Sequence, residues 1–585
     1  MWQYQAPLRD MRFVIEEWLA APNDWQNTAS FAGLDGELAA QILEEAGRFS
    51  AGVLAPLNAS GDQEGCQYAQ GKVKTPTGFP EAYKAFVEGG WASLACAEAD
   101  GGQGLPQLLN AALMEMLFAA NHAWAMYPGI AHGAYECLKA HGSDALKALY
   151  LPAIVSGEIL PTMCLTEPQA GSDVGLLRTR AEPSAAGQYR VTGNKVFVSG
   201  GEQDLTDNIL HLVLARLPDA PAGSRGISLF LVPKILPDGR RNSISCDGIE
   251  HKMGIRGSAT CTLSFEGAEG WLLGEPHRGL AAMFVMMNSA RLHVGLQGLG
   301  HAEAAWQNAS AYAAERQQMR AVSRPEGKPE AKVDPIHYHP AMRRTLLELR
   351  TLTEGMRALG YWTAHGLDLA EYADTPEQRQ QAHRWTALLT PVIKAYFTEQ
   401  GFRLASSALQ VFGGYGYVRE YAIEQTLRDS RIAMIYEGTN EIQANDLLLR
   451  KVIGDAGQGL QDLLQRMQQE IEQSESIPSC QTYARALADY GDKTSAITTT
   501  LIQAASTDPE RPYRAAGDYL RLIGLLSLGF VWLRSARLAA GREADPFYAA
   551  KQESAAFYFN YLLPEANHRL ALLGATRHGL PFLAE

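Results

Sequence analysis

The segment MCLTEPQAGSDVGLLRTRA (residues 163–181) lies where the pattern of the sequence changes from helical to stranded. Before it, apolar residues recur every three or four positions, which is typical of amphipathic helices. After it come short runs rich in β-branched residues, such as YRVTGNKVFVSG (189–200). From about Leu280 the helical period returns and continues nearly to the end. Long blocks of helix, strand and helix indicate an α+β fold and not an alternating βαβ fold.

These blocks predict four domains. They are an all-helical domain at 1–159, a β-sandwich or barrel at 160–278, a helical bundle at 279–473 and a C-terminal helical extension at 482–585. Thr192-Gly193-Asn194 predicts a hairpin turn between two alternating runs. The glycines of GLQGLG (295–300) lie inside a helical pattern, so we expect them to allow close helix packing.

Composition excludes several classes of protein. The 585 residues include 51 basic and 64 acidic side chains, a net charge of −13, which disfavours binding to nucleic acid or to an anionic membrane. The seven cysteines are scattered without a CxxC pair, so we expect a reducing compartment and no disulfide scaffold. No leader peptide and no apolar run of the roughly 20 residues needed for a membrane span is found, so we expect a cytoplasmic protein.

Metal and nucleotide motifs are also missing. The chain has no HExxH and no GxxxxGK[ST] motif, so we expect neither a zincin-type metal site nor a P-loop. His337 and His339 flank Tyr338 in a polar loop, where the interpretation as solvated loop residues is favoured over a metal pair.

Two segments carry candidate chemistry. The Gly, Ser and Asp cluster of 163–181 can turn backbone N–H groups toward an anion or a polar cofactor edge, although an ordinary Ser/Gly turn has the same composition. In RDSRIAMIYEGTNEIQ (428–443), Glu437 follows an apolar run, and desolvation there would raise its pKa toward that of a general base. The alternative is that Thr439 or Asn440 caps a helix and Glu437 lies in solvent.

Four patches in register resemble the acyl-CoA dehydrogenase family of flavoproteins. They are TEPQAGSDV (166–174), GNKVFVSGG (193–201), QVFGGYGYVREY (410–421) and IYEGTNEIQ (435–443). The resemblance covers roughly residues 75–455 and implies an N-terminal helical domain, a central antiparallel β domain and a C-terminal four-helix bundle. The extra C-terminal helices resemble the larger members, which include long-chain and 3-(methylthio)propanoyl-CoA dehydrogenases.

The resemblance implies that FAD is the cofactor, bound between the β domain and the C-terminal bundle. Arg316, Gln410, Gly413 and Gly414 match positions that contact the FAD of a neighbouring subunit, so a homodimer is expected. The remaining residues carried over as FAD contacts are Met163, Leu165, Thr166, Gly171, Ser172, Phe197, Ser199, Thr439 and Glu441.

By the same resemblance, Glu437 removes the α-proton of a saturated acyl-CoA while the β-hydride passes to flavin N5, which yields a trans-2-enoyl-CoA. Some members place the base before an arginine of the bundle, where this chain has Ala290 before Arg291, and alanine cannot accept a proton. The residues carried over as substrate contacts are Glu98, Ser172, Asn288, Arg291, Tyr436 and Gly438. For two of them an alternative stays open: a bundle salt bridge for Arg291 and a plain loop carboxylate for Glu98.

The resemblance also implies electron-transfer flavoprotein as the acceptor of the electrons. An acyl-CoA oxidase would use the same site with O₂ as the acceptor, and this alternative stays open. A DNA-associated adaptive-response flavoprotein ranks lower, because residues 456–585 carry 12 basic and 14 acidic side chains and a DNA-binding face should be basic. We therefore expect no nucleic-acid partner.

Overall fold

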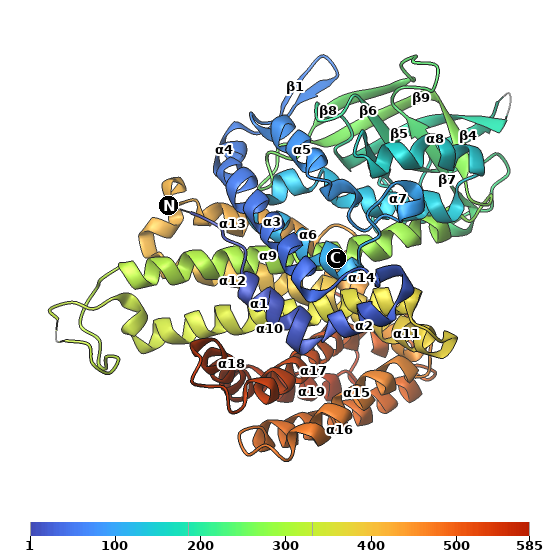
Figure 1. The fold of residues 1–585 in the computed structure, drawn as a ribbon. Helices are drawn as coiled ribbons and strands as arrows, with labels where there is room; N and C mark the ends of the chain where they lie inside the picture. Colours follow the sequence, from blue (N-terminus) through green and yellow to red (C-terminus); the bar gives the residue numbers. More distant parts are fainter. Residues whose placement is uncertain (1, 185–186, 330, 584–585) are drawn as a thin grey trace. The chain divides into compact units, whose positions relative to one another are not determined.

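The computed structural model describes residues 2–184, 187–329 and 331–583, which form two compact units. One unit comprises residues 45–293, and the other comprises residues 1–44 together with 294–585. We call them the sheet unit and the bundle unit. Figure 1 follows the chain through both. The family's layout of helices, β domain and helical bundle, as predicted, is present.

The sheet unit is built on seven strands whose pairing path closes on itself. The strand order is β3-β6-β4-β5-β9-β7, β6 also pairs β7, and β8 pairs β9. The bounds are β3 Ile159–Cys164, β4 Arg180–Pro183, β5 Gln188–Ser199, β6 Asn208–Arg216, β7 Ile227–Pro233, β8 Ile244–Ile249 and β9 Thr260–Leu273. β3 and β4 run parallel to β6, so the sheet is mixed and not purely antiparallel.

Helices on the sheet unit complete its core. They are α4 Pro56–Glu64, α5 Phe79–Glu88, α6 Gln107–Ala125, α7 Ala131–His141 and α8 Asp144–Val155, with a short hairpin of β1 Gln67–Ala69 and β2 Lys72–Lys74. Leu212 of β6 lies opposite Leu231 of β7 and, on the other side, opposite Met163 of β3. Leucines of β6 and β7 form one buried cluster with Tyr135 and Leu138 of α7.

The predicted hairpin turn at Thr192-Gly193-Asn194 is wrong. These residues lie within the continuous strand β5. Gly193 has φ +153°, and a Cβ there would lie 2.4 Å from the Thr179 hydroxyl. The glycine therefore provides space for a neighbouring backbone segment and does not form a turn.

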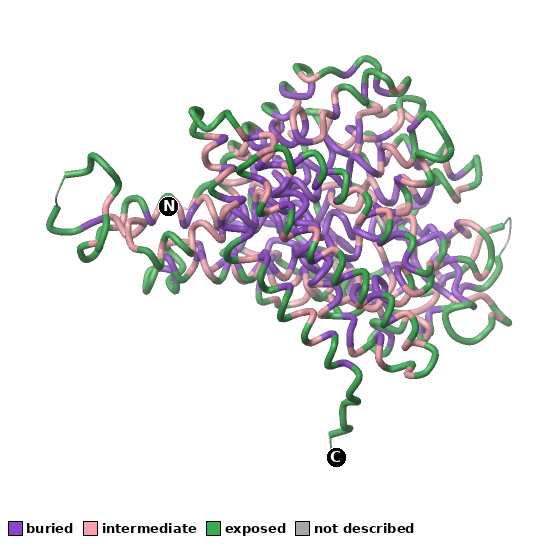
Figure 2. The backbone as a smooth tube through the Cα atoms, turned by 90° about the horizontal axis from the view of Figure 1, so that it is seen from below, coloured by how far each residue is buried: buried purple, intermediate pink, exposed green. Residues whose placement is uncertain are grey.

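Long helices form the bundle unit. They are α10 Pro340–Tyr372, α11 Pro376–Val392, α12 Thr398–Val411, α13 Ile423–Ser430, α14 Asn440–Asn445, α15 Gln458–Ser474, α16 Gln481–Ala504, α17 Arg511–Ala539, α18 Pro546–Phe557 and α19 Glu565–Ala575. The helix α9 (Gly279–Glu315) begins in the sheet unit and continues into the bundle unit. Residues 577–583 are exposed (Figure 2), with Phe582 97% accessible.

The glycines of 295–300 allow close helix packing, as predicted. A Cβ at Gly298 would lie 2.4 Å from the carbonyl oxygen of Phe397, and a Cβ at Gly401 would lie 2.4 Å from that of Gly298. Any larger side chain at either position would push α9 away from the segment that leads into α12.

Helix α17 is the one described helix that is long and apolar enough to cross a membrane. However, 83% of its most apolar stretch is buried inside the protein, as is usual for a core helix. It packs against α10, α15, α16, α18 and α19. Helix α17 is therefore a core helix of the bundle unit.

Residues 1–44, predicted within an N-terminal domain ending at 159, belong to the bundle unit instead. Fully buried Trp18 donates a hydrogen bond of 3.4 Å to the carbonyl oxygen of Val531 and packs edge-on against Trp362 and Phe530. These contacts join positions several hundred residues apart, which helical periodicity cannot reveal.

Candidate active site

Glu437 lies in a tight turn between the short helix η14 (Arg431–Met434) and α14. Glu437 and Gly438 are both in the left-handed region, with φ of +55° and +81°. The carbonyl oxygen of Glu437 accepts a hydrogen bond of 3.0 Å from the Gln443 side-chain amide. A Cβ at Gly438 would lie 2.8 Å from that amide nitrogen, so the turn requires glycine there. A non-glycine residue held at positive φ costs about 1–3 kcal/mol, and such strain is concentrated at functional sites.

The start of α14 fixes this turn. Thr439 caps the helix by accepting a hydrogen bond from the backbone N–H of Ile442. Asn440 accepts a hydrogen bond of 3.0 Å from the fully buried Lys394. The hydroxyl of Thr439 also lowers the pKa of Glu441, in the first turn of the helix. The N-cap that we weighed as an alternative role for this segment is therefore present, together with a partly buried Glu437.

Tyr436 places a phenol next to the Glu437 carboxylate. Its hydroxyl donates a hydrogen bond to Oε1 of Gln297 on α9. Burial first, and then the negative charge of Glu437, raise the pKa of Tyr436 above its ordinary value. The phenol therefore stays protonated, and the Glu437 carboxylate lies in a partly desolvated surrounding that favours proton transfer.

The bundle unit also gathers the residues expected to contact a partner's FAD. Arg316, just after α9, lies with its guanidinium carbon 5.4 Å from the ring centre of Tyr415. Gly413, Gly414 and Gln410 are exposed on the same turn, and a Cβ at either glycine would meet no atom within 4 Å. Tyr312 and Phe412, which stack 4.2 Å apart, hold α9 against this turn. The turn thus offers open space beside a cation, which suits a nucleotide phosphate.

In the sheet unit, a buried ion pair shapes the loop after β3. Glu167 lies 2.8 Å from the ammonium of fully buried Lys195 and accepts hydrogen bonds from the backbone N–H groups of Arg178 and Thr179. Lys195 also donates to the carbonyl oxygen of Leu165. Burial would raise the pKa of Glu167, but Lys195 and these hydrogen bonds outweigh it and lower that pKa to about 2. Sequence reasoning missed this pair because 28 positions separate its members.

This ion pair predicts an acid-dependent stability. Because the pKa of Glu167 is lower in the folded protein than its ordinary 4.5, the pair stabilises the fold above about pH 4.5 and loses this effect as the pH falls toward about 2. We expect Glu167→Gln to lower the unfolding temperature at neutral pH and to approach the wild type only as the pH falls to about 2. Circular dichroism melts across this range measure the difference. Glu182→Gln, at an exposed ion pair, serves as the control, and a penalty for Glu167→Gln that is independent of pH would contradict the prediction.

The ion pair holds β5 against the loop where the flavin contacts are predicted. The backbone N–H of Val196 donates a hydrogen bond of 3.0 Å to the carbonyl oxygen of Thr166. A bulge between Lys195 and Val198 leaves Phe197 at φ +59° with 62% of its surface exposed. Met163, Leu165 and Ser199 are partly exposed on the same segments. An exposed aromatic ring on a strained bulge is a surface that a flat aromatic cofactor can cover.

The exposed loop beyond Thr166 has room for a ligand as well. Gly171 and Ser172 are exposed, and a Cβ at Gly171 would meet no atom within 4 Å. The residues of the sheet unit therefore fit FAD. The exposed Phe197 ring offers a flat surface, the loop at Gly171 leaves open space, and the Ser172 hydroxyl is a hydrogen-bond donor. When bound, FAD supplies the acceptor for a hydride.

The predicted substrate contacts lie on both units. Tyr436 and Gly438 belong to the bundle unit, while Ser172, Arg291 and Glu98 belong to the sheet unit. Arg291 is 6% exposed, with its guanidinium 5.9 Å from the ring centre of Phe284. Glu98 is exposed in a short 3-10 turn, so its role as a pocket residue stays a prediction. The side chain of Asn288 lies outside the described part of the structure.

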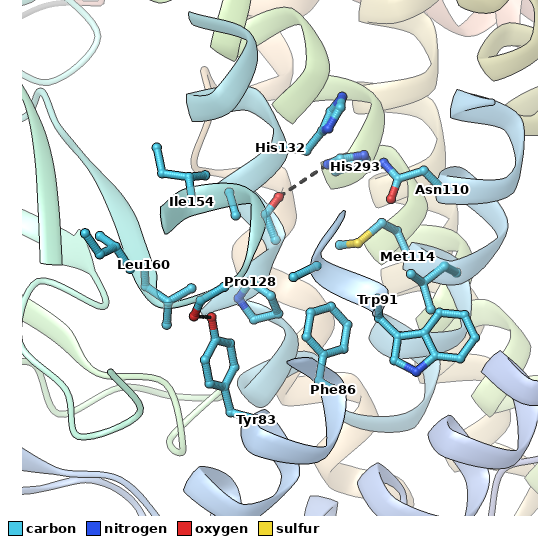
Figure 3. A pocket seen from close by; sticks show the side chains of 16 residues that line it. Tyr83, Phe86, Trp91, Asn110, Met114, Pro128, His132, Ile154, Leu160 and His293 are labelled. Carbon is cyan, nitrogen blue, oxygen red and sulfur yellow. Dashed lines mark hydrogen bonds between the residues drawn. The ribbon is translucent and has the colours of Figure 1, made fainter. Parts of the chain in front are cut away.

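A cavity in the sheet unit carries two histidines that the sequence did not single out (Figure 3). His293 lies 3.3 Å from the carbonyl oxygen of Gly129 through Nδ1, and His132 lies 2.6 Å from the Gln107 amide nitrogen. Burial lowers the pKa of His132 to about 3 and that of His293 to about 4, so both rings are neutral at neutral pH. Aromatic and apolar side chains form most of the wall: Tyr83, Phe86, Trp91, Met114, Ile154 and Leu160.

His337 and His339, the pair noted in the sequence, hydrogen-bond to backbone carbonyl oxygens of Ala313 and Gln318. They fasten the polar loop to the end of α9. Among the described residues, no group of three or more His, Cys, Asp or Glu side chains is arranged to hold a metal ion.

Family comparisons cover nearly the whole chain. Acyl-CoA dehydrogenase models match it in three parts: the N-terminal domain at 36–158, the middle domain at 162–268 and the C-terminal domain at 277–451. A model described as acetyl-CoA dehydrogenase C-terminal like matches residues 463–580. The 3-methylmercaptopropionyl-CoA dehydrogenase of Ruegeria pomeroyi is 41% identical, over 96% of this chain and 97% of that protein.

Two solved structures share the fold. The Caenorhabditis elegans ACDH-11 complex with C11-CoA aligns with a TM-score of 0.80 at 20% identity, over 95% of this chain and 91% of that chain. The Bacillus anthracis acyl-CoA dehydrogenase complexed with FAD aligns with a TM-score of 0.76 at 22% identity, again over 95% and 91%.

The fold and the matched models define a flavin-dependent oxidoreductase that acts on acyl-CoA. The chain belongs to the acyl-CoA dehydrogenase family, in which FAD is the cofactor.

Proposed function

We propose that this protein converts a saturated acyl-CoA to the trans-2-enoyl-CoA, with Glu437 as the base that removes the α-proton. The observation that supports this most directly is the strained turn of Glu437 and Gly438, which the Gln443 amide holds through a carbonyl oxygen. The carboxylate is partly buried beside the Tyr436 phenol.

The α-proton is acidic enough only if the thioester oxygen is polarised as charge develops on it. The turn of Glu437 and Gly438, with both residues at positive φ, supplies backbone N–H groups at this point. The role of this chain is therefore to orient the thioester, to accept a proton at Glu437 and to hold the hydride acceptor.

We further propose a short acyl chain with a thioether group as the preferred substrate, and electron-transfer flavoprotein as the electron acceptor. The 41% identity to a 3-methylmercaptopropionyl-CoA dehydrogenase over the full chain supports the substrate class. Anaerobic titration of the FAD-loaded enzyme with acyl-CoAs of graded length, with and without sulfur, tests it through loss of the visible flavin absorbance. No bleaching by any member would refute the desaturation, and steady production of hydrogen peroxide in air would identify an oxidase instead.

Subunit exchange tests whether the active enzyme is a homodimer that shares FAD contacts. If Arg316 acts on a partner's FAD, a mixed dimer of Glu437→Gln and Arg316→Ala chains keeps one complete site, whose wild-type Arg316 comes from the Glu437→Gln chain. We expect about half of the wild-type activity from purified mixed dimers that carry two different affinity tags, although each parent homodimer is impaired. Mixed dimers as inactive as both parents would show that Arg316 serves its own subunit.

A further inference from the structure

The bundle unit holds a second cavity, of about 400 Å³, that none of the residues assigned above lines. Helices α10, α12, α17 and α19 and the end of α18 line it, and α10 packs against α12, α17 and α18. Apolar and aromatic side chains form one part of the wall: Leu352, Leu525, Phe557, Tyr561 and Leu562. Charged side chains form the rest: Arg344, Glu348, Glu399, Arg403, Arg521, Glu565, His568 and Arg569.

The three carboxylates of this cavity are already paired with arginines. Glu348 lies 2.5 Å from Arg403, Glu399 pairs with Arg521, and Glu565 lies 2.5 Å from Arg569.

Arg344 is different from the other three arginines. Within the described ranges, it has no carboxylate in ion-pair distance, and its guanidinium lies 5.4 Å from the ring centre of Tyr561. The cavity therefore has one cation in excess of its acidic groups.

The hydroxyl of Tyr396 is a second polar group that a ligand in this cavity could contact. It is 3% exposed and lines the cavity, yet its hydroxyl has no hydrogen-bond partner in the part of the chain that the structure describes. Its ring is fixed in place, since a Cβ at Gly524 would lie 2.6 Å from Cδ2 of Tyr396. Burial raises the pKa of Tyr396, so the hydroxyl is protonated and can donate. Because Tyr396 lines the cavity and its hydroxyl bonds to no described residue, an anionic ligand in the cavity could accept a hydrogen bond from it.

We propose that this cavity binds a small organic anion, with a carboxylate or phosphate group held by Arg344 and Tyr396 and an apolar body packed on Phe557 and Tyr561. A guanidinium binds the two oxygens of such a group in parallel, and a hydroxyl donor adds a third hydrogen bond. Phe557, which is 6% exposed, then offers a buried apolar surface to the body of the ligand, while Tyr561, which is 57% exposed, lies at the rim. This site is separate from the chemistry at Glu437.

Calorimetric titration of the FAD-loaded enzyme with hexanoate, adenosine 5′-monophosphate and inorganic phosphate tests the proposal. We expect one of the two organic anions to bind once per chain, and the tighter one identifies the head group. Arg344→Gln should weaken this binding about tenfold, since a charge-assisted hydrogen bond is lost, and Tyr396→Phe should weaken it several-fold. Arg343→Gln, at the neighbouring arginine outside the cavity, should leave it unchanged.

Thermal melts serve as a check on folding, since both variants should unfold at the wild-type temperature. Binding that Arg344→Gln and Tyr396→Phe leave unchanged would overturn the proposal, as would no binding of either organic anion at about 10 mM. Inorganic phosphate that binds as tightly as the organic anions would also overturn it, because the apolar wall would then contribute nothing.

Discussion

Glu437→Gln is expected to abolish reduction of the bound flavin by acyl-CoA while leaving the flavin in place. Glutamine has the size of glutamate but cannot accept the α-proton, and a positioned general base contributes about 10²- to 10⁴-fold to rate. The backbone of the turn should persist, because Gln443 holds the carbonyl oxygen of residue 437 and not its side chain. The rate constant of flavin bleaching in an anaerobic stopped-flow experiment measures the effect.

The matched control is Glu472→Gln, which makes the same change at an exposed glutamate of α15. It should bleach at the wild-type rate. A Glu437→Gln enzyme that retains its yellow colour and also bleaches at that rate would show that another group accepts the proton. Loss of flavin from Glu437→Gln would instead indicate that the side chain supports cofactor binding.

Lys551→Met is expected to produce the largest loss of stability in the bundle unit. Lys551 pairs with Asp10 and lies 2.9 Å from Glu354, and Arg357 pairs with both Asp10 and Glu303. Burial would raise the pKa of Asp10, but Lys551 and Arg357 hold it below its usual range. Without Lys551, Glu354 would lose the ammonium that it pairs with, and Arg357 alone would pair with both Asp10 and Glu303. Removing one partner of a buried ion pair costs about 3–5 kcal/mol.

Urea unfolding followed by tryptophan fluorescence measures this loss, because Trp18, Trp362 and Trp532 lie in the bundle unit near these charges. Methionine fills the space of the lysine stem, so the effect reports the charge and not a cavity. Lys493→Met, at an exposed ion pair with Asp489, is the control and should unfold at the same urea concentration as the wild type, because solvent screens such a pair. Equal losses in the two variants would contradict the role of the network.

Part of this architecture could be predicted from local patterns. Helical periodicity over 280–317 anticipated α9 at Gly279–Glu315, and the change of pattern near Leu160 anticipated the start of the sheet at Ile159. Helical periodicity could not show that residues 1–44 pack with the helices beyond residue 294. The residues that Asp10 and Trp18 contact are hundreds of positions away in the chain. The turn predicted at Gly193 was wrong for a related reason: the residue that needs the space beside this glycine, Thr179, comes from another segment of the chain.

The candidate site likewise has a part that could be predicted from the sequence and a part that could not. The Glu437 turn could be predicted because its parts, an apolar run, a glycine and an N-cap, are consecutive in the chain. The supporting groups could not be predicted, because they come from distant segments. They are Lys394, which donates a hydrogen bond to Asn440, Lys195, which pairs with Glu167, and the two histidines of the cavity in the sheet unit. A buried lysine inside an apolar stretch, as at Lys394, is the one signal that could have indicated such a partner.

The sequence alone therefore determined the order of helix and strand, the class of the protein and the position of its expected base, since each depends on residues close together in the chain. Only the tertiary structure decided which charges are paired, which hydroxyl lacks a partner and where the cavities lie. Burial and pairing depend on which distant segments fold together, and the energy of a charge changes far more with that surrounding than with its neighbours in sequence.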